Sequence, residues 1–215
     1  MKIGTDVSKI MKIGTDVDEV LVPFAANYCI YHNNSYGTKA NETDLKIYRL
    51  ETLFNLTSDE NFRRISDFYK TEQFRNIPLH PFAKEFIAEI ARRGYLNHLI
   101  TSRYAAAREF TPQWAGSTFG SDVKGVLFTA DSHYDEEYTR KHKIMSKADT
   151  CIYNGLDIII EDNLTNALVC AEKGIHVILM NKKWNENGSL PERVTRAYNF
   201  GDALREIDRI DFLRV

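Results

Sequence analysis

The amino-acid sequence predicts an α/β fold, in which a Rossmann-like parallel sheet carries helices on both faces and a small helical segment is inserted after the first strand. Two observations support this prediction. Near-continuous apolar runs, such as LDIII at 156–160 and HVILM at 176–180, are typical of strands that are covered on both faces. These runs alternate with segments whose apolar residues recur at helical spacing, and such a βαβ rhythm is typical of a parallel sheet.

The composition is that of an ordinary globular protein. With 215 residues, 43% of them hydrophobic and 27% charged, the chain has room for one sizeable domain that carries a smaller insertion. Lys and Arg number 28 against 30 Asp and Glu, which leaves a net charge of −2. This balance supplies no general field for holding a nucleic acid polymer or an anionic membrane, so we expect neither as a partner.

The cysteines and the hydropathy indicate the compartment. The chain has 3 widely spaced cysteines without a CxxC pair, which is typical of a reducing environment. We find neither an apolar run of the ~18 residues that a membrane helix needs nor the hydrophobic region of a signal peptide. The expected location is therefore the cytoplasm, whereas the sequence leaves the oligomeric state open.

The first strand is expected at 11–15, where the run MKIGT leads to Asp16. Residues 22–78 then change character, because they are rich in Tyr, Phe and Asn and show helical spacing of apolar residues. A capping-box pattern that begins at Thr57 opens one of the helices in this segment. We therefore predict a small helical cap at 22–78.

The same decapeptide pattern occurs twice at the start of the chain. MKIGTDVSKI at 1–10 and MKIGTDVDEV at 11–20 are identical through their first seven positions. Ser8 stands in the first copy where Asp18 stands in the second, so only the second copy carries paired carboxylates. Residues 1–10 are therefore expected to lie outside the core, and their origin stays open between an added strand, a second start site and a cloning remnant.

The alternation of strands and helices continues through 79–215. In a helix that ends at Gly94, apolar residues are expected to line one buried face: Phe82, Phe86, Ile87, Ile90 and Ala91. Further strands are expected at 96–101, 125–129, 157–161 and 176–180, and helices at 105–114, 143–153, 165–173 and near 202–207. Residues 11–21 and 79–215 should thus form one catalytic core that the cap interrupts.

Polar side chains gather where three of these strands end. They are Asp16 and Asp18, Thr101 and Ser102, and Glu161 and Asp162. Ligands of open parallel sheets bind beyond the carboxyl ends of the strands. Because so many carboxylates at one edge repel each other unless a cation neutralises them, and because oxygen ligands favour Mg²⁺, the pattern predicts a magnesium site.

The order of these motifs resembles that of haloacid dehalogenase (HAD) superfamily phosphohydrolases. IGTDVDEVL at 13–21 is similar to their DxDx(V/T) motif, and HLITS at 98–102 resembles their second motif. KADTCIYNGLDIIIEDN at 147–163 resembles their third and fourth motifs, a helix-borne Lys and a strand that ends in two acids. The resemblance covers 11 to about 182 and implies a HAD-like core, with the insert in the place of that superfamily's first cap.

The resemblance also implies roles for the strand-end acids. Asp16 would be the nucleophile that forms an aspartyl-phosphate, and the Mg²⁺ would make its approach to a phosphate dianion tolerable. Asp18 would be the acid/base residue and would offer its backbone carbonyl to the metal. Asp162 would be a direct ligand of the metal, together with Asp16, while Glu161 would support this ligand set from behind.

The phosphoryl group would be held by the second and third motifs. Thr101 would donate hydrogen bonds to its oxygens, with Ser102 beside it, and a helix-borne lysine would offset their charge. Lys147 matches the sequence context of the motif lysine best, but Lys143 lies close enough in the sequence to take the same role.

The cap is expected to select the leaving group. Its Phe24, Tyr28 and Tyr31 could stack on a nucleobase or, alternatively, pack the cap. DVDEVLVPF at 16–24 also resembles the DxDGVLxxF start of 5′(3′)-deoxyribonucleotidases, although Glu19 stands where that family has Gly.

We therefore predict a Mg²⁺-dependent phosphatase for small phosphate monoesters, with nucleoside monophosphates as the leading class. The alternatives are a phosphotransferase or phosphomutase and a non-catalytic phosphate-binding protein. Packing roles are expected for His133, His142, Cys151, Trp114 and Trp184, although the loop after Met180, which contains Trp184, could also touch the substrate.

Overall fold

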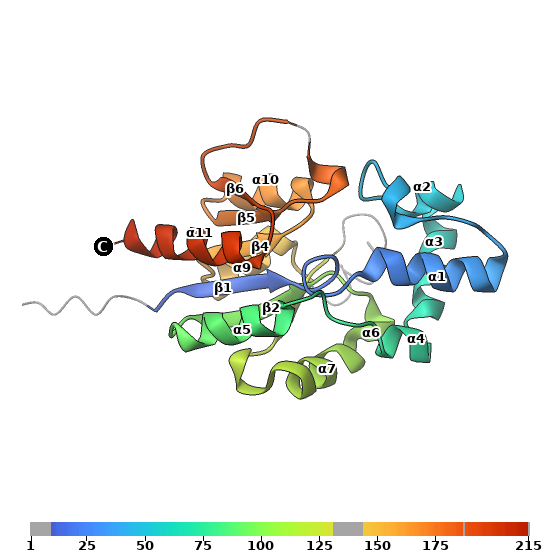
Figure 1. Cartoon of the computed structure of the whole chain (residues 1–215), viewed down its shortest axis with the longest axis horizontal. Helices are drawn as coiled ribbons and strands as arrows, with labels where there is room; N and C mark the ends of the chain where they lie inside the picture. The colour runs from blue at the N-terminus through green and yellow to red at the C-terminus, as the bar shows by residue number, and fades with distance from the viewer. Residues whose placement is uncertain (1–9, 131–143, 187, 215) are drawn as a thin grey trace, which may run out of the picture.

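The computed structural model describes residues 10–130, 144–186 and 188–214, so the duplicated segment 1–9 lies outside the described residues. Its centre is a sheet of six parallel strands in the order β3-β2-β1-β4-β5-β6 (Figure 1). The strands are β1 (Lys12–Asp16), β2 (Leu96–Thr101), β3 (Val126–Phe128), β4 (Ile158–Glu161), β5 (His176–Met180) and β6 (Val194–Ala197). The predicted fold class, a parallel α/β sheet with helices on both faces, is confirmed.

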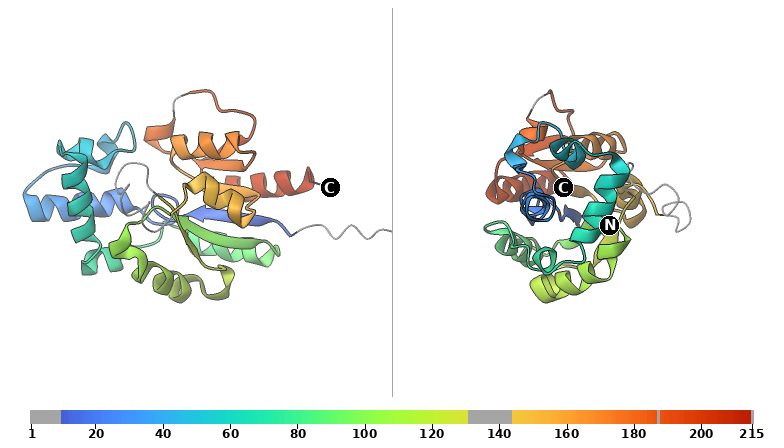
Figure 2. Two further views of the ribbon diagram at one scale, coloured as in Figure 1. Left: turned by 180° about the vertical axis from the view of Figure 1, so that it is seen from behind. Right: turned by 90° about the vertical axis from the view of Figure 1, so that its right-hand side faces the viewer.

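The core also contains helices, and the longer ones cover the two faces of this sheet. The core helices are α5 (Ala83–Arg92), α6 (Ala105–Arg108), α7 (Phe110–Phe119), α9 (Lys147–Asn154), α10 (Leu164–Glu172) and α11 (Phe200–Phe212), with short 3₁₀ turns η2 (Gly120–Asp122) and η3 (Lys183–Asn185). Helices α5 and α11 pack together on one face, and α9 and α10 pack together on the other (Figure 2). None of the described helices has the length and apolar character needed to cross a membrane.

Alternation along β4 divides the interior into two cores. Ile158 and Ile160 are completely buried toward the face that α5 and α11 cover, whereas Ile159 is completely buried in the cluster on the opposite face. Successive side chains of a strand point to opposite faces, so a strand covered on both sides must be apolar throughout. This requirement explains the continuous III run.

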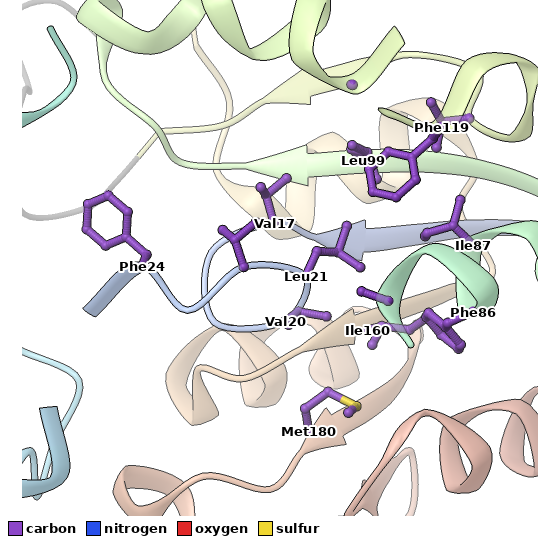
Figure 3. Close-up of a cluster of buried hydrophobic side chains, with 14 of the residues drawn as sticks. Val17, Val20, Leu21, Phe24, Phe86, Ile87, Leu99, Phe119, Ile160 and Met180 are labelled. Carbon is purple, nitrogen blue, oxygen red and sulfur yellow. The ribbon is translucent and has the colours of Figure 1, made fainter. Parts of the chain in front are cut away.

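The turn after β1 is anchored in the same interior as α5. Val17, Val20 and Leu21 are buried together with Ile87 of α5 and Ile160 of β4 (Figure 3). These apolar contacts fix the path of the chain directly after Asp16. The short segment that carries Asp18 and Glu19 is therefore held by the core and cannot move freely.

The insert, residues 22–78, lies beyond the carboxyl ends of the strands, at the right of Figure 1. It contains α1 (Phe24–Tyr36), η1 (Glu42–Asp44), α2 (Leu50–Phe54), α3 (Ser58–Phe68) and α4 (Glu72–Arg75). Thr57 caps α3 as predicted, because its hydroxyl accepts a hydrogen bond from the Glu60 amide at 3.2 Å. The helical character predicted for this segment is therefore present.

Several predicted boundaries were wrong. The segment 105–114 is not one helix but the start of two, α6 and α7. The helix predicted at 143–153 begins at Lys147, because the Ser146 side chain caps it by accepting from the Asp149 amide. Strand β6 was not predicted, since VTRA carries no continuous apolar run.

Phe82 does not line the buried face of α5. It precedes the helix with a positive φ of 66° and leaves 73% of its surface exposed, whereas Phe86, Ile87 and Ile90 are buried as expected. Phe82 lies four positions before Phe86, which matches helical spacing, but the helix begins only at Ala83 and so Phe82 is outside it.

Candidate active site

Three carboxylates meet at the carboxyl edge of the sheet. Asp16 ends β1 and Glu161 ends the adjacent strand β4, with Asp162 directly after it. One carboxylate oxygen from each residue lies within 4.8 Å of the other two, and all three residues are buried. The parallel register thus brings together acids that are about 145 positions apart in the sequence, as the strand-end pattern predicts.

Lys147 supplies the positive charge beside these acids. Its Nζ donates to Asp16 Oδ1 at 2.6 Å and to Glu161 Oε2 at 2.7 Å. The lysine is the first residue of α9, and the cap formed by Ser146 fixes where this helix begins. The alternative, Lys143, lies outside the described residues.

The three acids outnumber the one lysine that is hydrogen-bonded to this cluster. Burial raises the pKa of Asp16 to about 8; Lys147 opposes this rise, and the charge of Glu161 adds to it. Burial, followed by the charges of Glu161 and Asp16, also raises the pKa of Asp162 well above its usual range. One lysine cannot neutralise three ionised carboxylates, so the cluster favours binding either protons or a cation, and its oxygen atoms are the donor set that a hard divalent cation prefers. The residues present therefore fit Mg²⁺.

The two acids after β4 differ in their surroundings. Glu161 is engaged at both oxygens, because Oε2 accepts from Lys147 and Oε1 accepts from the Asn163 amide and from Asn166 Nδ2, both at 3.2 Å. Asp162 accepts a hydrogen bond at Oδ2 from the indole of Trp184 at 3.0 Å. Glu161 is thus held at both carboxylate oxygens, and Asp162 is held at Oδ2.

The second motif lies at the neighbouring strand end. Thr101 is buried, and its Oγ1 accepts from the Arg103 amide at 3.3 Å. The Ser102 hydroxyl is hydrogen-bonded to Thr129 Oγ1 at 2.8 Å. Both residues line the same cavity as the three acids.

Arg103 is a site residue that the sequence analysis missed. Its guanidinium holds the Asp18 carboxylate in a fork, with Nε at 2.9 Å from Oδ2 and a terminal nitrogen at 2.7 Å from Oδ1. Arg103 is only 3% exposed, and its guanidinium carbon lies 4.9 Å from the ring centre of Phe74 and 5.5 Å from that of Trp114. The available signal was a basic residue directly after Thr101 and Ser102.

Glu19 occupies a left-handed backbone position in the turn after Asp18. Its φ of 67° explains why the resembled family has Gly there, since a residue with a side chain is strained in this conformation. The Glu19 carboxylate accepts from the Ala25 amide in the first turn of α1, where Pro23 provides no side-chain cap. Burial raises the pKa of Glu19 to about 7, and the hydrogen bond from Ala25 opposes this rise. The departure from Gly thus links the core turn to the insert.

A cavity of about 750 Å³ opens over the carboxylates. Core residues line it from below: Asp16, Asp18, Thr101, Ser102, Arg103, Lys147, Glu161, Asp162 and Trp184. Residues of the insert line it from the other side: Phe24, Tyr48, Asn61, Ile65 and Tyr69 among them. The volume is typical of sites for small molecules.

The three aromatic residues predicted to bind substrate have different positions. Phe24 lines the cavity, but the residues that line it in the described part of the chain do not include Tyr28 or Tyr31. Tyr28 is completely buried inside the insert, where its hydroxyl donates to Asn61 Oδ1 at 3.1 Å, and Tyr31 packs against Phe68 with ring centres 5.0 Å apart. Both belong to the interior of the insert, because helical spacing does not say which apolar face meets a neighbouring helix and which meets a cavity.

Tyr48 and Trp184 both line the cavity, and their rings are in contact. Their ring centres are 5.2 Å apart, one on the insert and the other on the loop after β5. Trp184 thus contacts both the insert and Asp162, which is more than the packing role expected for it. Trp114 and buried Cys151 lie in packing positions, whereas His133 and His142 lie outside the described residues.

Comparisons with known proteins concern the fold. No family model matches the sequence, and no curated protein matches it. Among solved structures, the haloacid dehalogenase-like hydrolase SP0104 from Streptococcus pneumoniae superposes with a TM-score of 0.61 at 17% identity, over 92% of this chain and 98% of that one.

Two further structures show the same likeness. A protein described as a HAD-hydrolase, YfnB from Bacillus subtilis, was solved bound to magnesium; its TM-score is 0.58 at 13% identity, over 93% of this chain and 99% of that one. A protein described as a phosphoglycolate phosphatase from Haemophilus somnus has a TM-score of 0.55 at 15% identity, over 94% and 99% of the two chains. The structural neighbours are thus HAD-superfamily hydrolases and phosphatases, and the chain has their HAD-like fold.

Proposed function

We propose that this protein is a Mg²⁺-dependent phosphohydrolase that cleaves small phosphate monoesters through an aspartyl-phosphate. One observation carries the proposal: Asp16 lies at the floor of an open cavity, hydrogen-bonded to a buried lysine and clustered with two further acids. A buried, strongly perturbed carboxylate cluster at the ligand-binding edge of a sheet is costly to maintain for stability alone. The magnesium-bound HAD-hydrolase among the structural neighbours agrees with this reading.

The metal would be held by Asp16, Asp162 and the backbone carbonyl of Asp18, with Glu161 orienting the set. When bound, Mg²⁺ supplies the positive charge that lets an anionic nucleophile approach an anionic phosphate. The carboxylate of Asp16 then attacks phosphorus, and the bond between phosphorus and the ester oxygen breaks. Asp18, once one of its oxygens leaves the Arg103 fork and carries a proton, donates that proton to the leaving alkoxide, so the alcohol departs uncharged.

Hydrolysis of the acyl phosphate follows with the same residues. Asp18, now a carboxylate, takes a proton from a water molecule that attacks phosphorus, and the bond to the Asp16 oxygen breaks. Lys147, Thr101 and Ser102 bind the phosphoryl oxygens in both steps. Inorganic phosphate is released, and Asp16 and Asp18 return to their starting states.

Residues 11–21 and 79–215 act as the catalytic core in this proposal, and the insert acts as a cap that selects the leaving group. Nucleoside monophosphates are the class that the cavity favours, because Phe24, Tyr48 and Trp184 offer aromatic surfaces close to the acids. Stacking of a planar base on such rings contributes about 1 kcal/mol per contact. Residues 1–10 contribute no catalytic group, so their removal should leave activity unchanged.

The decisive experiment is phosphate release from an activated aryl phosphate. Activity should appear with Mg²⁺, disappear with a chelator, and fall by several powers of ten in Asp16→Asn, since the nucleophile is lost. Asp59→Asn, at an exposed position in the first turn of α3, is the matched control and should retain activity. Equal turnover by Asp16→Asn and the control would reject the proposal.

The substrate class is tested on the same preparation. Nucleoside monophosphates should exceed sugar phosphates in kcat/KM by at least tenfold, and an added acceptor alcohol should not divert the phosphoryl group from water. Predominant transfer to the alcohol would indicate a phosphotransferase instead.

A further inference from the structure

The loop between β5 and β6 is built against Asp162. Asn185 in this loop is almost completely buried, and its Nδ2 donates to the backbone oxygens of Asp162 at 2.7 Å and Met180 at 2.8 Å. One amide group thus joins the loop to the ends of both β4 and β5. The loop is thereby fixed beside the residue that follows β4.

The other side of Asn185 is equally constrained. Its Oδ1 accepts from Arg196 at 2.6 Å and from the Lys182 amide at 3.1 Å, and its backbone oxygen accepts from Arg196 at 2.7 Å. Arg196 lies on β6 and is itself part of the sheet. This degree of hydrogen bonding determines the position of the neighbouring residue, Trp184, to within a narrow range.

Trp184 uses this position to hold the side chain of Asp162. Its indole Nε1–H donates to Asp162 Oδ2 at 3.0 Å, and its ring lies 5.2 Å from the ring of Tyr48 of the insert, centre to centre, at an interplanar angle of 41°. Lys147 donates to the other two acids of the cluster, Asp16 and Glu161. The indole is thus a hydrogen-bond donor to Asp162, just as Lys147 is a donor to Asp16 and Glu161.

We infer that Trp184 is a positioning residue that holds the Asp162 carboxylate ready for the divalent cation. The inference rests on the proposed function and adds a role that the motif residues do not include. In the ionised state that binds a cation, Asp162 is repelled by Asp16 and Glu161, and this repulsion favours rotation of its side chain away from the cluster. A neutral donor on one oxygen resists that rotation, while cation binding needs only the other oxygen. Removal of such supporting hydrogen bonds typically weakens metal binding by about tenfold to a hundredfold.

Calorimetric titration with Mg²⁺, in the absence of substrate, measures this effect directly. Trp184→Phe keeps an aromatic ring against Tyr48 but removes the N–H donor, so its Kd for Mg²⁺ should rise about tenfold or more. Tyr153→Phe also removes a donor from an aromatic ring, at an exposed position of α9, and should leave the Kd within twofold of the wild type. A packing role for Trp184 would instead lower the thermal midpoint of the metal-free protein and leave the Kd unchanged.

Activity distinguishes failure of this inference from failure of the proposed function. In Trp184→Phe, the Mg²⁺ concentration for half-maximal phosphate release from an aryl phosphate should rise together with the calorimetric Kd. Mg²⁺-dependent turnover by both proteins with equal Kd values would overturn the positioning role alone. Absence of Mg²⁺ binding by the wild type would overturn both.

A second measurement is independent of the folding of Trp184→Phe. In Trp114→Phe, Trp184 is the one tryptophan left, because the chain has 2. Its emission should change as Mg²⁺ is added, with a midpoint equal to the calorimetric Kd, because the carboxylate bonded to its N–H becomes a metal ligand. Constant emission through saturation would contradict the inference.

Discussion

The interior of the insert and the edge of the core are both buried, but the first consists of apolar side chains and the second of ionisable ones. In the insert, the rings of Phe24, Tyr28 and Phe68 pack with centres 5.6 to 6.1 Å apart. At the core edge, Asp16 lies only eight positions before Phe24 in the sequence, and it is buried together with Glu161, Asp162 and Lys147. Apolar burial in the insert stabilises the folded chain. At the core edge, the cost of removing charged groups from water offsets much of the stabilisation that burial would otherwise give.

The difference shows where stability and chemistry lie in this molecule. Aromatic packing at 5 to 7 Å contributes favourable contacts beyond area burial, and similar residues can replace each other. A buried acid cluster with too few cations does not repay its desolvation. Its presence at the ligand-binding edge agrees with selection for a bound cation and substrate. Substitutions in the two regions should therefore differ in what they change.

The largest expected effect is on stability, in the insert. Phe68 is completely buried among aromatic rings, so Phe68→Ala leaves a cavity and should lower the free energy of unfolding by about 3–5 kcal/mol. Denaturant titration measures this loss, and kcat on an aryl phosphate, per folded molecule, should change less than tenfold. Phe212→Ala, at a residue that is 79% exposed, is the control and should cost under about 0.5 kcal/mol. A kcat loss of a thousandfold with little change in stability would break the comparison.

The next effect is on chemistry, at the core edge. Arg103→Met removes the fork that orients Asp18, so kcat should fall by about a hundredfold, which corresponds to about 2.7 kcal/mol of barrier. Arg103→Lys keeps the charge but not the two-pronged geometry, so its kcat should lie between those of Arg103→Met and the wild type. Arg75→Met, at a half-exposed arginine of α4, provides the control. Steady-state kinetics at saturating Mg²⁺ checks the order, and a wild-type kcat in Arg103→Met would show that Asp18 needs no positioning.

A smaller effect is expected where the two regions meet. Tyr48→Leu removes the ring that packs on Trp184 and lines the cavity, so KM for a nucleoside monophosphate should rise about fivefold to tenfold, equivalent to about 1 kcal/mol. The KM for a small aryl phosphate should change less than twofold. Tyr153→Leu, on the exposed side of α9, should alter neither value. Equal losses on both substrates would mean that Tyr48 only packs the insert.

The smallest effect concerns pH and the insert. Arg64 donates to His32 Nε2 at 2.7 Å, and an arginine cannot accept, so the buried His32 ring is neutral and donates from Nδ1 to Thr38. Burial, together with the charge of Arg64, lowers the pKa of His32 to about 4 from 6.5. Between these two pH values the unfolded chain binds a proton that the folded chain excludes, so stability should fall as pH decreases from about 6.5 to about 4.

His32→Gln tests this pH dependence. The variant should be less stable than the wild type at pH 7, but its thermal midpoint should fall by a few degrees less between pH 6.5 and pH 4.5. Circular dichroism melts at closely spaced pH values give the slopes. Identical slopes in the two proteins would assign the pH dependence to other groups.

The sequence by itself determined the fold class and the location of the acids. Apolar runs and helical spacing are properties of neighbouring residues, and a parallel sheet brings all strand carboxyl ends to one edge. Consequently the strand pattern alone was enough to place Asp16, Thr101 and Asp162 at one edge of the sheet. Thr57 could likewise be recognised as a helix cap, since capping is a contact over three residues.

Only the tertiary structure decided which side chains meet across longer distances. Arg103 reaches Asp18 over 85 positions and Trp184 reaches Asp162 over 22, and both contacts depend on the paths of loops. The insert is a similar case, because Tyr28 and Tyr48 are both aromatic residues in a helical segment, yet the first fills its interior and the second lines the cavity. The spacing of apolar residues predicts that one face of a helix is buried, but only the tertiary structure shows which neighbouring element covers that face.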